Sequence, residues 1–218
     1  MKVQHHNDTF PYVVIDNVYD DSELDLIWKE LDYLMDGDKF NPPHVVESAT
    51  SKDVILKKNM SLWLDDVYPD RRYSNILRCS RKLYESIEFI WSGSESWWFR
   101  SLLGSLDVLD QDTTLISYYD QEDYYKSHYD KGILTCLTWL YREPKAFDGG
   151  DFILNATMND KKHLLNETTD SETVELKNNR TVMFPGIIPH QVTPIKMKHK
   201  GKKGMGRFCI TLFVNTRG

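Results

Sequence analysis

Apolar residues recur at helical spacing in the first half of the chain. In DDSELDLIWKELDYLM (20–35), six apolar residues fall on one helical face, and Ser22 can cap the start of the helix. The strand-like run FPYVVIDNVY (10–19) precedes this helix, and a second helix is predicted over 74–91. A third, shorter helix is predicted over 96–104. This half therefore combines a strand with amphipathic helices that need a surface to pack against.

From about residue 113 the pattern changes to short β-rich runs separated by polar turns. The runs are TTLISYY, ILTCLTWLY, GGDFIL, TVELK, RTVMF and RFCITLFV. Several short strands at close spacing indicate a sandwich or barrel rather than a parallel α/β sheet. We therefore predict one domain, 1–218, of mainly β (α+β) class. Its support region would span 1–112, and its β core would span 113–215.

Composition narrows the class of protein. Hydrophobic residues make up 40% of the 218 positions and charged residues 28%, which is a globular profile rather than a disordered or fibrous one. No window reaches the roughly 18 apolar residues of a membrane helix. The formal net charge of −6 disfavours a nucleic-acid partner. The oligomeric state stays open.

The cysteines and the first residues of the chain indicate the cellular compartment. Cys79, Cys136 and Cys209 lie far apart, so they form neither a disulfide framework nor a Cys-x-x-Cys metal site. The start, MKVQHHNDTF, lacks the apolar stretch of a signal peptide. A cytoplasmic protein with buried thiols is therefore expected.

The sequence His128-Tyr129-Asp130 is the first candidate for chemistry. Residues i and i+2 of a strand share a face, so the imidazole and the carboxylate could hold one metal ion. His6-Asn7-Asp8 has the same spacing but lies in a polar segment. The apolar run ILTCLTWLY follows His128 and places this pair at the mouth of a core, where a carboxylate needs a partner.

A third ligand would complete a site of two histidines and one carboxylate, the facial triad of non-haem iron. His163 lies in a polar loop, and His199 lies in a lysine-rich run. His44 occurs early, in a loop-like segment. His190 alone follows an apolar strand and turn, RTVMFPGIIP. It is the preferred candidate, although a core histidine hydrogen-bonded to backbone gives the same pattern.

Arg207 begins the last apolar strand, GRFCITLFVN, and shares a face with Thr211. A guanidinium in a buried strand needs an anion, and its planar fork suits a carboxylate. That carboxylate could belong to the protein or to a cosubstrate. Tyr119 ends the strand LISYY, where its phenol could also reach an anion or could simply pack.

These residues occur in an order that resembles the prolyl 4-hydroxylase-like branch of the Fe(II)/2-oxoglutarate-dependent dioxygenases. The resemblance covers about 113–215, and 1–112 match only loosely. The matching positions are Tyr119, His128-Tyr129-Asp130, Gly149-Gly150-Asp151-Phe152, Phe184-Pro185-Gly186, His190-Gln191-Val192-Thr193-Pro194 and Arg207-Phe208-Cys209-Ile210-Thr211.

The resemblance implies a double-stranded β-helix (jelly-roll) core with supporting N-terminal helices. It implies that His128, Asp130 and His190 bind Fe(II). It also implies that Arg207 binds the distal carboxylate of 2-oxoglutarate, with help from Tyr119 and Thr211. Trp139 stands where relatives often carry an aromatic residue near that carboxylate.

The implied reaction consumes O2 and 2-oxoglutarate and hydroxylates an unactivated C–H bond, with ascorbate as an optional cofactor. No acid or base beyond the metal ligands is implied. The implied substrate is a prolyl residue of a peptide or protein. A free amino acid or other small molecule is the alternative, and a non-catalytic jelly-roll module that binds a metal or another ligand is a rival. The nucleic-acid demethylase branch fits worse, because its second arginine is replaced by Phe213.

Three features depart from the pattern or stay open. His190 and Arg207 are 17 residues apart, and relatives often have about ten; the lysine-rich segment 196–203 accounts for the excess. That segment is either a solvated hairpin tip or a lip that attracts acidic substrates. DQEDYY replaces a glycine-rich turn before His128. Residues 37–60 are long and polar enough to form a lid.

Overall fold

Two antiparallel sheets face each other in the computed structural model, which describes residues 1–7, 9–43, 50–51, 54–93, 109–155, 171–199 and 203–216. The seven-stranded sheet has the order β1 (Lys2–His6), β2 (Tyr12–Asp16), β12 (Arg180–Pro185), β8 (Leu134–Leu140), β15 (Arg207–Asn215), β6 (Gln111–Tyr119) and β5 (Met60–Trp63). The four-stranded sheet has the order β11 (Ser171–Val174), β10 (Phe152–Asn155), β13 (His190–Val192) and β7 (Tyr125–His128).

Two smaller pairs complete the strands of the described part of the chain. They join β14 (Ile195–Met197) to β9 (Phe147–Gly149), and β3 (Thr50–Ser51) to β4 (Val54–Ile55). Neighbouring strands in the large sheet are often far apart in sequence, as in a jelly roll. The predicted mainly β class and jelly-roll core are confirmed.

The two faces of the large sheet bury different sets of residues because side chains alternate along each strand. Towards the smaller sheet, Trp139 and Cys209 join a cluster with Phe152. On the opposite face, Phe208 and Ile210 pack into a cluster with the first helix. Residues on both faces of the last strand, β15, are therefore buried.

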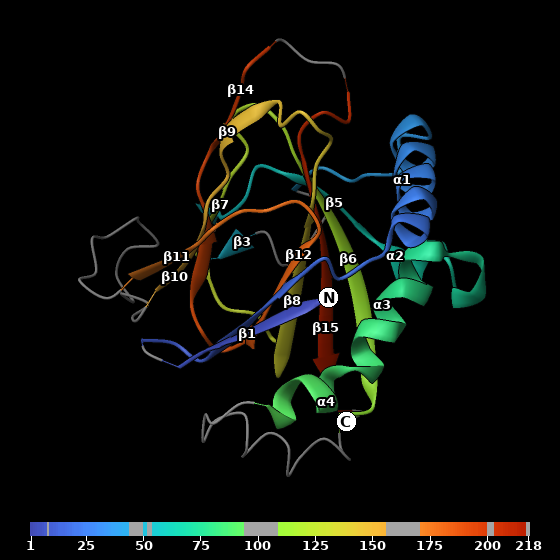
Figure 1. Cartoon of the computed structure of the whole chain (residues 1–218). Helices are drawn as coiled ribbons and strands as arrows, with labels where there is room; N and C mark the ends of the chain where they lie inside the picture. Colours follow the sequence, from blue (N-terminus) through green and yellow to red (C-terminus); the bar gives the residue numbers. More distant parts are fainter. Residues whose placement is uncertain are drawn as a thin grey trace.

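The helices cover the face of the large sheet that lies away from the smaller sheet (Figure 1). They are α1 (Asp21–Asp36), α2 (Leu64–Val67), η3 (Arg71–Tyr73), α3 (Asn75–Glu85) and α4 (Ile87–Ser92). The single helix predicted over 74–91 is two helices, which meet at Ser86. The Ser86 hydroxyl donates to the Lys82 carbonyl, as a residue that ends a helix does. The helix predicted over 96–104 lies outside the described residues.

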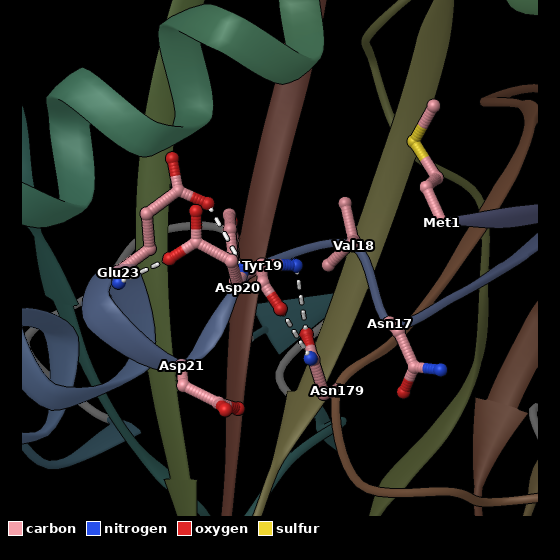
Figure 2. A pocket seen from close by; sticks show the side chains of 8 residues that line it. All are labelled: Met1, Asn17, Val18, Tyr19, Asp20, Asp21, Glu23 and Asn179. Atoms are coloured by element: carbon pink, nitrogen blue, oxygen red, sulfur yellow. Dashed lines mark hydrogen bonds between the residues drawn. The ribbon is translucent and has the colours of Figure 1, made fainter.

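Asp20, and not Ser22, caps α1. The Asp20 carboxylate accepts from the Glu23 backbone N–H at 2.9 Å, and the Glu23 carboxylate accepts from the Asp20 N–H at 3.1 Å (Figure 2). Ser22 donates its hydroxyl to the Asp20 carboxylate instead. Ser22 as the cap was therefore wrong. The reciprocal contacts between Asp20 and Glu23 form a capping box, which satisfies two backbone donors and starts the helix at Asp21.

A surface hollow lies beside this cap. It is lined by Met1, Asn17, Val18, Tyr19, Asp20, Asp21, Glu23 and Asn179 (Figure 2). The Asn179 amide accepts from the Tyr19 N–H at 3.0 Å and donates to the Tyr19 carbonyl at 2.7 Å. The Asn179 amide therefore holds the turn that precedes α1. The lining of the hollow contains no histidine, lysine or arginine.

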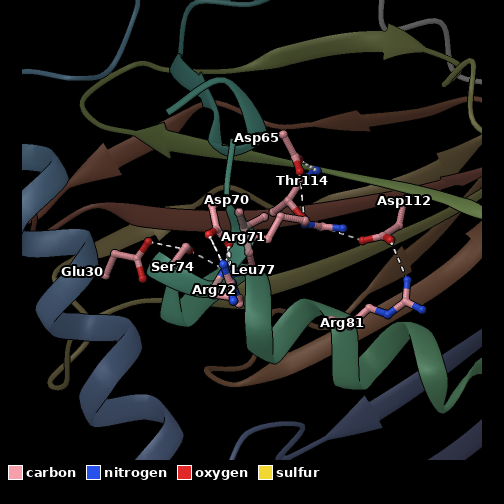
Figure 3. A network of polar contacts seen from close by, with 10 residues as sticks. All are labelled: Glu30, Asp65, Asp70, Arg71, Arg72, Ser74, Leu77, Arg81, Asp112 and Thr114. Atoms are coloured by element: carbon pink, nitrogen blue, oxygen red, sulfur yellow. Dashed lines mark hydrogen bonds and ion pairs between the residues drawn. The ribbon is translucent and has the colours of Figure 1, made fainter. Parts of the chain in front are cut away.

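Buried polar contacts attach the helices to each other and to the sheet (Figure 3). The Glu30 carboxylate of α1 accepts from the Ser74 hydroxyl at 2.6 Å and from the backbone N–H of Asn75, at the start of α3, also at 2.6 Å. At the far end, Arg71 and Arg81 flank the Asp112 carboxylate of β6, at 2.7 and 3.1 Å. These contacts fix the helical layer in register with the sheet. No helix among the described residues is both long and apolar enough to cross a membrane.

We predict that Glu30→Ala lowers the free energy of unfolding by about 2 kcal/mol, because it leaves the buried donors at the start of α3 without an acceptor. Urea denaturation measures this loss. Asp25→Ala, at an exposed position of the same helix, is the control and should change stability by less than about 0.5 kcal/mol. Equal effects of both variants would contradict the role of Glu30.

Candidate metal centre and anion site

Three side chains from two segments of the chain converge at one edge of the smaller sheet. His128 ends β7 and His190 begins β13, and the two are partners across the antiparallel pair. Asp130 follows in the loop after β7. Its carboxylate oxygens lie 3.8 Å from His128 Nε2 and 3.5 Å from His190 Nε2. Ligand atoms of all three residues lie within 4.8 Å of one another.

Backbone carbonyls orient both imidazoles. His128 Nδ1 lies 2.8 Å from the Lys126 carbonyl, and His190 Nδ1 lies 2.9 Å from the Ile188 carbonyl. Each Nδ1 must therefore carry the proton, which leaves the Nε2 lone pair facing Asp130. Burial, and then the nearby His190, lower the pKa of His128 well below its ordinary value. Two imidazoles that present Nε2, together with one carboxylate, form a donor set that fits a divalent iron ion.

Asp130 is held from two sides. The Thr135 hydroxyl donates to its carboxylate at 2.7 Å, and its backbone N–H donates to the Gly186 carbonyl at 2.8 Å. A Cβ on Gly186 would lie only 2.0 Å from the Gly132 carbonyl oxygen, so no other residue fits there without displacing this loop. Sequence reasoning missed Thr135, although the alternation of ILTCLTWLY places it on the same face as Trp139.

The other histidines weighed in the sequence do not join this group. His6 lies on β1 and stacks on Tyr12, with ring centroids 4.3 Å apart. His199 is exposed. Asp8, His44 and His163 lie outside the described residues. Among the described residues, His128, Asp130 and His190 alone form a group of three potential ligands.

Arg207 lies in the barrel interior with no solvent-exposed surface. One guanidinium nitrogen, Nη1, donates to the Gly150 carbonyl. Nε and Nη2 are buried without a hydrogen-bond partner, and no carboxylate of the described residues lies within 4.0 Å of the guanidinium. The charge instead lies over the rings of Tyr119, at 4.9 Å, and Trp139, at 5.5 Å.

Tyr119 and Thr211 stand at different distances from this cation. Tyr119 is directly opposite Arg207 in the β6–β15 pair. Burial raises the pKa of Tyr119, and the charge of Arg207 partly opposes that shift. Thr211 is buried on the same face, four residues further along β15, with its hydroxyl 3.8 Å from Cys209 Sγ. The structure thus brings Tyr119 and Trp139 to Arg207, but it gives Thr211 no contact with the guanidinium.

Comparison with known proteins agrees with this geometry. Residues 114–215 match the family model of the 2OG-Fe(II) oxygenase superfamily. No curated protein sequence matches the chain. The fold is similar to that of a Pseudomonas putida prolyl-4-hydroxylase, with a TM-score of 0.57 at 15% identity, over 96% of this chain and 95% of that one.

Two other solved structures share the fold. A prolyl 4-hydroxylase from Phytophthora capsici has a TM-score of 0.52 at 19% identity, over 94% of this chain and 58% of that one. The non-haem alpha-ketoglutarate-dependent epimerase SnoN, from nogalamycin biosynthesis, has a TM-score of 0.51 at 10% identity, over 93% of this chain and 76% of that one. At these identities the likeness concerns the fold.

We predict that Thr135→Val weakens Mn(II) binding about tenfold or more, because it removes the hydroxyl that orients Asp130. Isothermal titration calorimetry measures this affinity. Thr138→Val, on the opposite face of β8, removes a buried hydroxyl that pairs with Thr181 at 2.7 Å and should leave Mn(II) affinity unchanged. Unchanged affinity in Thr135→Val would exclude a metal role for this contact.

Proposed function

We propose that this chain, which belongs to the 2OG-Fe(II) oxygenase superfamily, is a hydroxylase whose substrate is a prolyl residue of a peptide or protein. Fe(II) would be its metal, and 2-oxoglutarate and O2 its cosubstrates. A free amino acid or other small molecule is the second candidate substrate. We further propose that 1–218 act as one cytoplasmic domain that binds no nucleic acid.

The buried guanidinium of Arg207 carries this proposal. Removing a charge from water costs several kcal/mol unless an anion compensates it. Gly150 and two aromatic rings supply only partial negative charge. The edge formed by Nε and Nη2 presents two parallel donors, the geometry that a carboxylate accepts. A non-catalytic module would instead be expected to pair Arg207 with a carboxylate of the protein.

The donor set of the metal centre supports the iron part of the proposal. His128, Asp130 and His190 would hold the ion, and three protein ligands leave open positions for a 2-oxo acid and O2. When bound, iron supplies the activation of O2. The protein orients the ligands through the Lys126 and Ile188 carbonyls, and it keeps the cosubstrate end dry through the rings around Arg207.

Two observations favour a peptide or protein substrate. Two of the similar folds are named prolyl 4-hydroxylases, although SnoN shows that the same fold also serves an epimerase. Next to the metal centre, Tyr129 and Ile187 are 55% and 68% exposed. The hydrogen bond from the Asp130 N–H to the Gly186 carbonyl joins their two segments beside the site. Exposed apolar side chains at a site mark a binding surface.

We predict that Arg207→Met weakens 2-oxoglutarate binding at least about 100-fold while Mn(II) binding is kept, because it removes only the anion partner. Calorimetry with the Mn(II)-loaded protein measures both affinities. Arg142→Met, which removes a partly exposed arginine paired with Asp32, is the control and should bind 2-oxoglutarate normally.

Asp130→Ala should behave differently from Arg207→Met. It should lose Mn(II) binding and abolish succinate production, while its circular dichroism spectrum stays native, because Asp130 is a loop residue at the edge of the core. Undiminished turnover in Asp130→Ala would remove it from the metal centre. Undiminished 2-oxoglutarate binding in Arg207→Met would favour the non-catalytic module.

For the exposed rim we predict that Ile187→Ser raises the KM for prolyl peptides roughly tenfold without changing 2-oxoglutarate affinity, because it removes apolar contact area for the peptide alone. Steady-state assays on a peptide library test this. Phe89→Ser, at an equally exposed position on α4, should leave the KM unchanged. The same KM in the unmodified protein, Ile187→Ser and Phe89→Ser would favour a small-molecule substrate.

A further inference from the structure

A second cation, Lys57, is buried in the barrel and lies outside the roles described so far. It is 1% exposed and lies three residues before the start of β5, in an isolated strand bridge with Tyr125 of β7. Its Nζ donates to the Ser61 hydroxyl at 3.0 Å and lies 5.5 Å from the centre of the Tyr125 ring. Ser61 is paired with Ser117, on the interior face of the large sheet.

Lys57 is close to the metal centre. The Tyr125 ring that it faces stacks on His128, with centroids 3.5 Å apart. The charge of Lys57 also contributes to lowering the pKa of His128, after the larger effects of burial and His190. One aromatic ring therefore separates the ammonium from a proposed iron ligand.

The ammonium has no anionic partner among the described residues. Their ion pairs include Lys58 with Glu122 at 3.6 Å, but none involves Lys57. An ammonium has three donors, and one is used by Ser61. Burial lowers the pKa of Lys57 to about 8, so the group stays mostly protonated at neutral pH. An unpaired buried charge is costly, and a purely structural position would favour an apolar residue.

Lys57 stays unpaired once the proposed function is assumed. A ferrous ion and the 2-oxoglutarate dianion balance each other, and Asp130 balances Arg207. Among the described residues Asp123 is a further buried carboxylate, but no ion pair joins it to Lys57. A low-dielectric site with an unpaired positive charge favours a substrate that brings a negative one.

We infer that Lys57 is a specificity-determining residue that binds a carboxylate of the substrate, close to the carbon that is hydroxylated. This inference rests on the proposed function and deepens it. The carboxylate could be an acidic side chain beside the target residue, or the free carboxyl group of a C-terminal or free amino acid. Either carboxylate would accept hydrogen bonds from the two ammonium N–H groups that do not donate to Ser61.

Calorimetric titration tests this on protein loaded with Mn(II) and 2-oxoglutarate. The probes are matched pairs: prolyl peptides with Glu or Gln beside the proline, and peptides ending in proline as the free acid or the amide. In one of these two kinds of pair, the peptide with the carboxylate should bind at least about tenfold more tightly than its neutral partner. That pair identifies the source of the carboxylate. Lys57→Met should remove this preference, whereas Lys58→Met, at the exposed neighbouring lysine, should keep it.

The outcomes separate the two proposals. Equal binding within every pair, including no binding by any peptide, would overturn the inference, as would an acid preference that survives in Lys57→Met. Weaker 2-oxoglutarate binding in Lys57→Met would assign Lys57 to the cosubstrate and also overturn it. Failure of the unmodified protein to bind 2-oxoglutarate would overturn the proposed function instead. Lys57→Gln replaces Lys57→Met if the latter does not fold.

Discussion

A guanidinium without a counter-ion in the interior of a β-barrel is the constraint on which the rest of the structure depends. Arg207 is fully buried between β6 and β8, and its contacts with Gly150, Tyr119 and Trp139 do not neutralise it. A folded protein tolerates such a charge when a ligand compensates it. The barrel therefore has an anion-binding end, which the rings of Tyr119 and Trp139 keep dry.

The antiparallel register brings the chemistry together from distant parts of the chain. Pairing of β7 with β13 sets His128 opposite His190, although they are 62 residues apart. Pairing of β6 with β15 sets Tyr119 opposite Arg207 in the same way. Backbone carbonyls and the Thr135 hydroxyl then fix the rotation of each ligand. Strand pairing thus adds His190 to the local pair of His128 and Asp130, and it sets Tyr119 beside Arg207.

Much of this could be predicted from residue patterns because alternation determines which side chains share a face. The grouping of Arg207 with Thr211 on one face follows from that rule, whereas the choice of His190 over His199 follows from the apolar run that precedes His190. Other features depend on tertiary contacts. Ser22 and Asp20 are both acceptable caps in isolation, and only the reciprocal contact with Glu23 selects Asp20. Lys57 lies beside a polar loop, where a lysine ordinarily faces solvent, and its burial follows from pairing with β7.

The most direct test of the central claim is a crystal structure of the protein with Mn(II) and 2-oxoglutarate. The account predicts the metal bound by His128 Nε2, His190 Nε2 and the Asp130 carboxylate, with the distal carboxylate of 2-oxoglutarate on Nε and Nη2 of Arg207. A metal bound elsewhere, or an Arg207 paired with a carboxylate of the protein itself, would contradict it.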